Sequence, residues 1–240
     1  MQTLDQILNQ LRSEGGEKYK SNVVRMGIPE ESSLGVPIPV IRKMGKRIGR
    51  NHRLGLDLWN SPYHEAKLLA ALIIEPAETD RQVLEKLMAD VASWDLCDHI
   101  CKSLIIELPY YGDLIYEWAG DNRLYFKRAA FVLICAELIK FKSIEEDKID
   151  SYLELILQNS GDSRTHVRKG INWALRDIGK FNHSCHEKAI SAAWNLTESG
   201  DSDRRWIGRN ALKELEKLIE VRERRRLLSS DTKVGRRNLN

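Results

Sequence analysis

The chain has 240 residues, 42% of them hydrophobic, and carries a formal net charge of +3. This length is enough for one large domain or a repeat array with an extensive core. No apolar run approaches the length of a membrane span and the N-terminus lacks a signal-peptide pattern, so we expect no membrane partner.

The four cysteines, Cys97, Cys101, Cys135 and Cys185, all fall inside predicted helices. This usage is typical of reduced thiols in a cytoplasm rather than of a disulfide framework. Cys97 and Cys101 with His99 could suggest a metal, but a Cys-x-x-x-Cys spacing on a helix is weak and both thiols lie on a core stripe. We therefore predict a cytoplasmic protein with no metal and no cofactor.

The basic surplus lies at the C-terminus. From Leu218 onward seven lysines and arginines stand against three acidic residues. We expect one repeat domain over residues 1–228 and a basic, flexible tail over 229–240. Such a tail is either solvated or a non-specific phosphate contact.

Nearly every segment has the apolar period of a short helix, and no alternating strand pattern persists. Capping boxes at Thr3–Gln6 and Ser143–Glu146 predict two helix starts, and Gly27–Pro39 is the longest irregular piece. The class is therefore all-α. The predicted helices cover Leu4–Leu11, Val40–Ile48, Ala66–Ile74, Val83–Val91, Leu96–Leu104, Leu124–Ile139, Tyr152–Leu157, Val167–Ile178, Ala189–Leu196 and Ile207–Ile219.

An internal echo favours stacked repeats. The segment Ile41–Lys46 recurs as Leu175–Lys180, and Trp59-Asn60 recurs as Trp194-Asn195. The offset equals about three repeats of roughly 45 residues, the size of a HEAT-type helix pair. We expect an α-α superhelix, a HEAT-like repeat solenoid, with a concave basic groove.

The stretch Ser93–Cys101 predicts a helix with Ser93 as N-cap, its hydroxyl accepting a free amide of the first turn. Its core stripe lies on one side, while Trp94 and Asp98, four residues apart, share a face turned away from that stripe. An indole beside a carboxylate there is either a functional pair or a half-exposed tryptophan next to a solvated aspartate.

Two further residues stand out. Trp173 lies opposite the core stripe of its helix, among Lys169, Arg176 and Lys180, where it could pack on a neighbouring helix or on a nucleic-acid sugar or base. Arg128 lies in a helix that is apolar nearly all round, so its guanidinium needs an anionic partner. That partner is either an internal carboxylate or a phosphate of a ligand.

Several motifs together, in their order and spacing over most of the chain, resemble the AlkD-like DNA alkylation repair family of HEAT-like repeat glycosylases. They are W-D-x-x-D from Trp94, K-R-A-A-F from Lys127, K-x-I-x-W-A-L-R-x-I-G-K from Lys169, Leu34–Pro37 with Arg42 and Gly45-Lys46, Leu58-Trp59 with Glu65-Ala66, and Arg205–Ile207 with Ala211-Leu212.

The resemblance implies roles for single residues. Asp98 matches the catalytic carboxylate, Trp94 and Trp173 match the two indoles that face the sugar, and Arg128 matches an arginine that contacts phosphate. Some members carry a tyrosine in the second helix near the lesion; we expect that tyrosine to be absent here, because Met26 falls near its position. We also expect the basic neighbours of Trp173 to contact DNA phosphates.

The function that the resemblance implies is hydrolysis of the N-glycosidic bond of cationic N3- or N7-alkylated purines in duplex DNA, without base flipping. The expected partner is double-stranded DNA with alkylated bases, bound by a monomer in the cytoplasm at the nucleoid. One alternative is a catalytically silent HEAT-like module that binds damaged or branched DNA. A peptide-binding scaffold is another, because solenoids commonly bind peptides.

Overall fold

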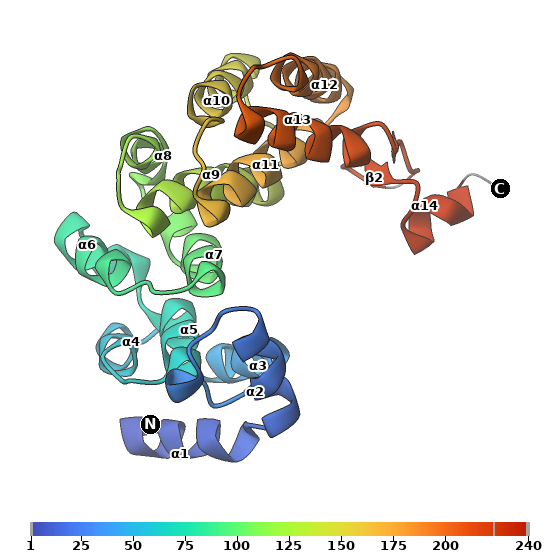
Figure 1. Cartoon of the computed structure of the whole chain (residues 1–240). Helices are drawn as coiled ribbons and strands as arrows, with labels where there is room; N and C mark the ends of the chain where they lie inside the picture. The colour runs from blue at the N-terminus through green and yellow to red at the C-terminus, as the bar shows by residue number, and fades with distance from the viewer. Residues whose placement is uncertain (1, 223, 239–240) are drawn as a thin grey trace. The chain divides into compact units, whose positions relative to one another are not determined.

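A computed structural model describes residues 2–222 and 224–238, and their regular secondary structure is almost entirely helical (Figure 1). The all-α prediction is therefore confirmed. The described helices are α1 Leu4–Glu14, α2 Glu17–Arg25, α3 Ile38–Ile48, α4 His52–Trp59, α5 His64–Ile73, α6 Arg81–Ala89, α7 Trp94–Ser103, α8 Tyr111–Ala119, α9 Leu124–Lys140, α10 Glu146–Asn159, α11 Thr165–Gly179, α12 His183–Thr197, α13 Ser202–Leu215 and α14 Lys233–Asn238. None of them is long and apolar enough to cross a membrane.

The chain divides into two compact units, Met1–Tyr111 and Gly112–Asn240. The sequence led us to expect a single repeat domain over 1–228, and whether the two units act as one domain stays a prediction. The concave basic groove likewise stays a prediction. Each unit is described below by itself.

The first unit is organised around α5, which is buried along most of its length and packs against α3, α4 and α7. Its Glu65, only 2% exposed, accepts hydrogen bonds from the backbone N–H groups of Leu34 (2.9 Å), Gly35 (2.7 Å) and Val36 (3.2 Å). The Ser33 hydroxyl donates a fourth, at 3.2 Å. One buried carboxylate thus holds the loop before α3 in place, because three adjacent donors converge on it.

Gly35 makes this loop conformation possible. Its φ of +75° lies in the left-handed region, which costs a residue with a Cβ. A Cβ at this position would also lie 2.6 Å from the carbonyl oxygen of Gly16. The Leu34–Pro37 motif and Glu65 are therefore parts of one structural feature.

The second unit has α9 at its centre, and this helix is buried nearly all round, as its sequence predicted. It packs mainly against α11. Glu137, 3% exposed, is its buried anion and accepts hydrogen bonds from the Tyr152 hydroxyl and from Lys148 Nζ. These contacts satisfy the carboxylate and fix α10 on α9.

All ten predicted helices exist, with ends that differ by a few residues, but α2, α4, α8 and α14 were not predicted. No residue of α2 is fully buried, and α4 has Gly55 in its interior. The Thr3–Gln6 capping box is confirmed. The prediction of a capping box at Ser143–Glu146 is wrong, because α10 begins at Glu146 and has no side-chain cap.

The C-terminal residues form a short antiparallel hairpin, β1 Leu218–Ile219 with β2 Leu228–Ser229, followed by α14. Arg225 donates to the carbonyl oxygens of Leu138 (3.0 Å) and Ile139 (3.1 Å) at the end of α9. At least one of the C-terminal arginines therefore stabilises the second unit through hydrogen bonds to its backbone. The flexibility of the 229–240 tail stays a prediction, and its last two residues lie outside the described part.

Candidate functional site

The first turn of α7 is held by Asp95. This carboxylate accepts hydrogen bonds from the Ser93 hydroxyl (2.7 Å) and the Leu96 amide (2.9 Å), and it lies 2.8 Å from Nε2 of His64 on α5. Ser93 is the N-cap residue, as predicted, but the predicted bond from its hydroxyl to a free helix amide is absent, because the hydroxyl is used on Asp95. Burial raises the pKa of Asp95, but the contacts with His64, Ser93 and Leu96 together lower it by more. The pKa of this carboxyl is therefore below its usual value.

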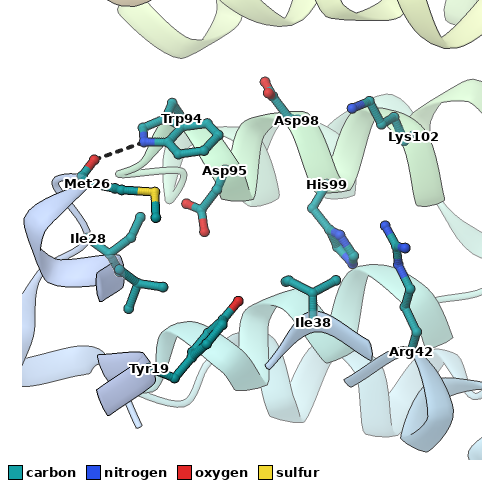
Figure 2. Close-up of a pocket in the computed structure, with 11 residues that line it drawn as sticks. Tyr19, Met26, Ile28, Ile38, Arg42, Trp94, Asp95, Asp98, His99 and Lys102 are labelled. Carbon is teal, nitrogen blue, oxygen red and sulfur yellow. Dashed lines mark hydrogen bonds between the residues drawn. The ribbon is translucent and has the colours of Figure 1, made fainter. Parts of the chain in front are cut away.

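Trp94 is fixed at the same turn. Its indole Nε1 donates to the backbone carbonyl of Met26 at 3.0 Å, which ties α7 to the end of α2 (Figure 2). The indole is half-buried. Its orientation is therefore set by a hydrogen bond to a segment 68 residues away, which no local pattern could indicate.

Trp94 and Asp98 line the same pocket, of about 260 Å³, between α2, α3 and α7 (Figure 2). Asp98 is only 8% exposed, so the alternative of a solvated aspartate is wrong. The other lining residues are Tyr19, Val23, Met26, Ile28, Ile38, Arg42, Asp95, His99 and Lys102. The predicted pair of indole and carboxylate is thus brought together beside a cavity.

His99, which from its sequence context was a candidate only for a metal ligand, lines the pocket. Burial and the charge of Arg42 lower the pKa of His99 to about 4, so the ring is neutral at pH 7. It makes a hydrogen bond to the backbone of Leu68, while Nε2 has no partner among the described residues. In the described part of the chain no three histidine, cysteine or acidic residues could hold a metal, and all four cysteines are buried as thiols.

Tyr19 and Met26 correct the expectation for the second helix. Met26 is 54% exposed and lines the pocket, but Tyr19 on α2 lines it as well (Figure 2). A tyrosine therefore does come from the second helix. Tyr19 was not recognised from the sequence because no helix was predicted over Glu17–Arg25.

Arg128 lies in the second unit and is 5% exposed, as expected for a central helix. Its Nη1 donates to the carbonyl oxygen of His166 at 2.6 Å, so the guanidinium contacts the first turn of α11. The assignment of Arg128 to a DNA phosphate stays a prediction.

The α11 face around Trp173 is less positive than its sequence indicated. Arg176 and Lys180 both bind Glu214 of α13, at 2.5 and 2.6 Å, whereas Lys169 is exposed. Burial raises the pKa of Glu214, but Lys180 and Arg176 lower it to below its usual value. Trp173 is half-buried on this face.

The candidate residues are thus divided between the units. Trp94 and Asp98 belong to the first unit, and Arg128 and Trp173 belong to the second. That all four face one groove stays a prediction.

Comparison with known proteins settles the family. The profile of the DNA alkylation repair enzymes matches residues 7–215, which is most of the chain. The chain belongs to the DNA alkylation repair enzyme family. The matched range includes Trp94, Asp98, Arg128 and Trp173, and it ends before the C-terminal hairpin.

A solved structure supports the fold of this family member. One match, with a TM-score of 0.75 and 18% identity, covers 99% of this chain and 94% of the other. It is described as a new family related to the HEAT-like repeat DNA glycosylases, with affinity for branched DNA structures. A designed armadillo repeat protein has a TM-score of 0.34 at 15% identity, with 88% and 99% of the two chains covered. A search of curated proteins found no match. The predicted HEAT-like repeat fold is confirmed.

Proposed function

We propose that this protein is a DNA glycosylase that removes cationic N3- or N7-alkylated purines from duplex DNA. The observation that carries the proposal is the pocket-lining pair of Trp94 and Asp98 on α7 in a member of the DNA alkylation repair enzyme family. Asp95 and the Met26 carbonyl fix the turn that bears this pair. A preorganised carboxylate is what charge stabilisation in a transition state requires.

The chemistry needs few groups. When the bond between C1′ and the alkylated base nitrogen breaks, its electron pair stays with the base, and the cationic ring leaves as a neutral molecule. Positive charge then develops on the sugar, where the Asp98 carboxylate stabilises it and orients a water. The water oxygen bonds to C1′ and loses a proton. The indole of Trp94 excludes solvent and offers its π face to the cation.

The second unit supplies contacts to the DNA in this proposal. Trp173 faces the sugar, and Arg128 contacts a phosphate with Lys169, Arg176 and Lys180 as further cations. Lys169 is exposed, whereas the last two already share Glu214. A phosphate would therefore have to compete with Glu214 for Arg176 and Lys180, so these two should contribute less to the salt dependence of binding than Lys169.

A catalytically silent DNA-binding module is the second candidate. The structural neighbour with a TM-score of 0.75 belongs to a group with affinity for branched DNA, and this supports a similar role here. Such a protein would keep its basic residues and would not depend on Asp98.

The two candidates separate in one experiment. The wild-type chain is incubated with methylated duplex DNA, and released bases are measured by chromatography; binding to a four-way junction and to a plain duplex is measured in parallel. The glycosylase proposal predicts release of 7-methylguanine or 3-methyladenine with rates above the spontaneous loss. Junction binding with no release above background would overturn it in favour of the silent module.

A further inference from the structure

Helix α3 and the turn after it carry several cations and no carboxylate. The exposed cations are Arg42, Lys43, Lys46, Arg47 and Arg50. Among the residues that the structure describes, none of these side chains forms an ion pair with a carboxylate. The second unit differs, because Glu214 of α13 binds two cations of the α11 face.

Neutral groups hold two of these side chains in place. Arg47 Nη2 donates to the side-chain oxygen of Gln10 on α1 at 2.6 Å. Arg50 donates to backbone carbonyl oxygens, one of them that of Ile74 at 2.7 Å. Amide and carbonyl oxygens orient a guanidinium without cancelling its charge, so each side chain stays available to an anion.

Folding by itself does not favour this arrangement. Arg42 and Lys46 are four residues apart, as are Lys43 and Arg47, and like charges at this spacing destabilise a helix. The helix dipole favours cations in the last turn, which accounts for Lys46 and Arg47. It does not account for the two cations one turn earlier. A bound anion offsets the repulsion of all four.

Three of the cations line a cavity between α1 and α3. The cavity has a volume of about 480 Å³, and its lining residues on α3 are Val40, Lys43, Met44, Lys46 and Arg47. Gln10 and Glu14 line it from α1, so one carboxylate stands against three cations. Lys43 and Arg47 are about 6 Å apart along the helix axis, because the rise is 1.5 Å per residue. A row of cations with apolar side chains beside it fits a strand of phosphates and sugars.

We propose that Lys43, Lys46 and Arg47 bind phosphates of a DNA strand and so give the first unit its own contact with the DNA backbone. This contact rests on the proposed function for its partner, DNA, but not on base excision. DNA is the occupant that the charges favour, because each nucleotide presents a phosphate and the cations stand in a row. The phosphate contacts expected from the sequence all lie in the second unit. A contact on α3 holds the strand on the unit that carries Asp98.

A salt titration of binding to a short fluorescent duplex, followed by anisotropy, tests this contact. Each phosphate contact contributes about 0.9 to the slope of the logarithm of the binding constant against the logarithm of the salt concentration. The α3 variant carries Lys43→Gln and Arg47→Gln. We expect it to lower the slope by about 1.8 and to weaken binding about tenfold or more, and Lys43→Gln alone to lower the slope by about 0.9.

The matched control carries Arg53→Gln and Lys86→Gln, which remove two exposed cations from α4 and α6 of the same unit and leave α3 intact. It should bind the duplex within about twofold of the wild type, with an unchanged slope. Melting temperatures establish that every variant is folded.

Each outcome decides one question. An unchanged slope in the α3 variant, or an equal decrease in this variant and the control, overturns the phosphate contact. A poly-glutamate peptide is titrated in parallel, and loss of affinity for this peptide but not for DNA overturns the contact in favour of an acidic protein partner. Release of methylated bases is measured separately. A wild type that releases no base, with a slope that depends on α3, overturns base excision and supports the contact, whereas release with a slope independent of α3 does the reverse.

Discussion

His99 is a neutral side chain buried beside two carboxylates and two cations. Its ring is 8% exposed, and its pKa is lowered first by burial and then by the charge of Arg42, against a smaller opposing effect of Asp95. A proton that binds this histidine in the unfolded chain at its ordinary pKa of 6.5 binds the folded chain only near pH 4. The unfolded state therefore binds more protons between these values, and stability falls as the pH falls through that window.

Because the pKa of His99 falls from 6.5 to about 4, we expect this residue alone to lower the free energy of unfolding by about 3 kcal/mol between pH 6.5 and 4. His99→Gln removes the titrating group. The difference between variant and wild type in urea unfolding, measured at pH 4, 5.5 and 7, should change by that amount. Curves for the two proteins that run parallel over the whole window would contradict this account.

Single residues show where the sequence was informative. The helix spacing of Trp94 and Asp98 placed them on one face, and the structure brings both to one pocket. The environment of Arg176 and Lys180 could not be predicted in this way. Their partner, Glu214, lies on α13, more than thirty residues further along the chain, and no periodicity connects the two helices.

At the level of elements, Glu65 controls the loop before α3. Four donors from residues 33–36 converge on this one buried carboxylate. The substitution Glu65→Ala leaves those donors without an acceptor. A hydrogen bond to a charged group contributes about 1.5–3 kcal/mol to stability, although water can replace part of what is lost. We expect a loss of roughly 3 kcal/mol or more in the free energy of unfolding, measured in urea.

The matched control is Glu31→Ala, an exposed glutamate close to the same loop, which should change stability by less than about 0.5 kcal/mol. Amide exchange of Leu34, Gly35 and Val36 should accelerate in Glu65→Ala alone. Unchanged exchange at these three amides would show that the carboxylate does not hold the loop.

Arg128 connects two elements of the second unit. Its bond to the His166 carbonyl gives it a structural role, and the proposed function adds a phosphate contact. Arg128→Ala is expected to weaken binding to damaged and undamaged duplex alike. The slope of the logarithm of the binding constant against the logarithm of the salt concentration should decrease by about one phosphate contact. A salt titration by fluorescence anisotropy measures this slope. A lower melting temperature with an unchanged salt slope would leave only the structural role.

The elements that could be predicted are those with a wide buried stripe. Helices α9 and α11 each bury most of their apolar residues, and their patterns were unambiguous. Helix α2 buries none of its residues fully, so its apolar pattern was weak. Because α2 was not predicted, Tyr19 was not recognised as a pocket residue. It lines the pocket together with Trp94 because α2 and α7 lie on the same cavity.

For the whole molecule, we expect selectivity to depend on the charge of the lesion. At pH 7 His99 is neutral, because its pKa is about 4, and Asp95 is ionised, because its pKa is lowered, so neither is suited to protonate a leaving base. A cationic N7-methylguanine should therefore be released, while neutral uracil and hypoxanthine should remain. Duplexes of one sequence with each lesion, assayed for base release, measure this. Efficient release of uracil would contradict the mechanism.

The central claim is that the Asp98 carboxylate stabilises the positive charge that develops on the sugar as the base departs. The substitution Asp98→Asn tests this claim most directly. Single-turnover release of 7-methylguanine from duplex DNA is measured for the wild type, for Asp98→Asn and for Asp57→Asn, an exposed aspartate on α4 of the same unit. We expect Asp98→Asn to keep its affinity for DNA and its melting temperature and to lose roughly two to three orders of magnitude in rate. Asp57→Asn should match the wild type. Excision by Asp98→Asn at the wild-type rate would contradict the account.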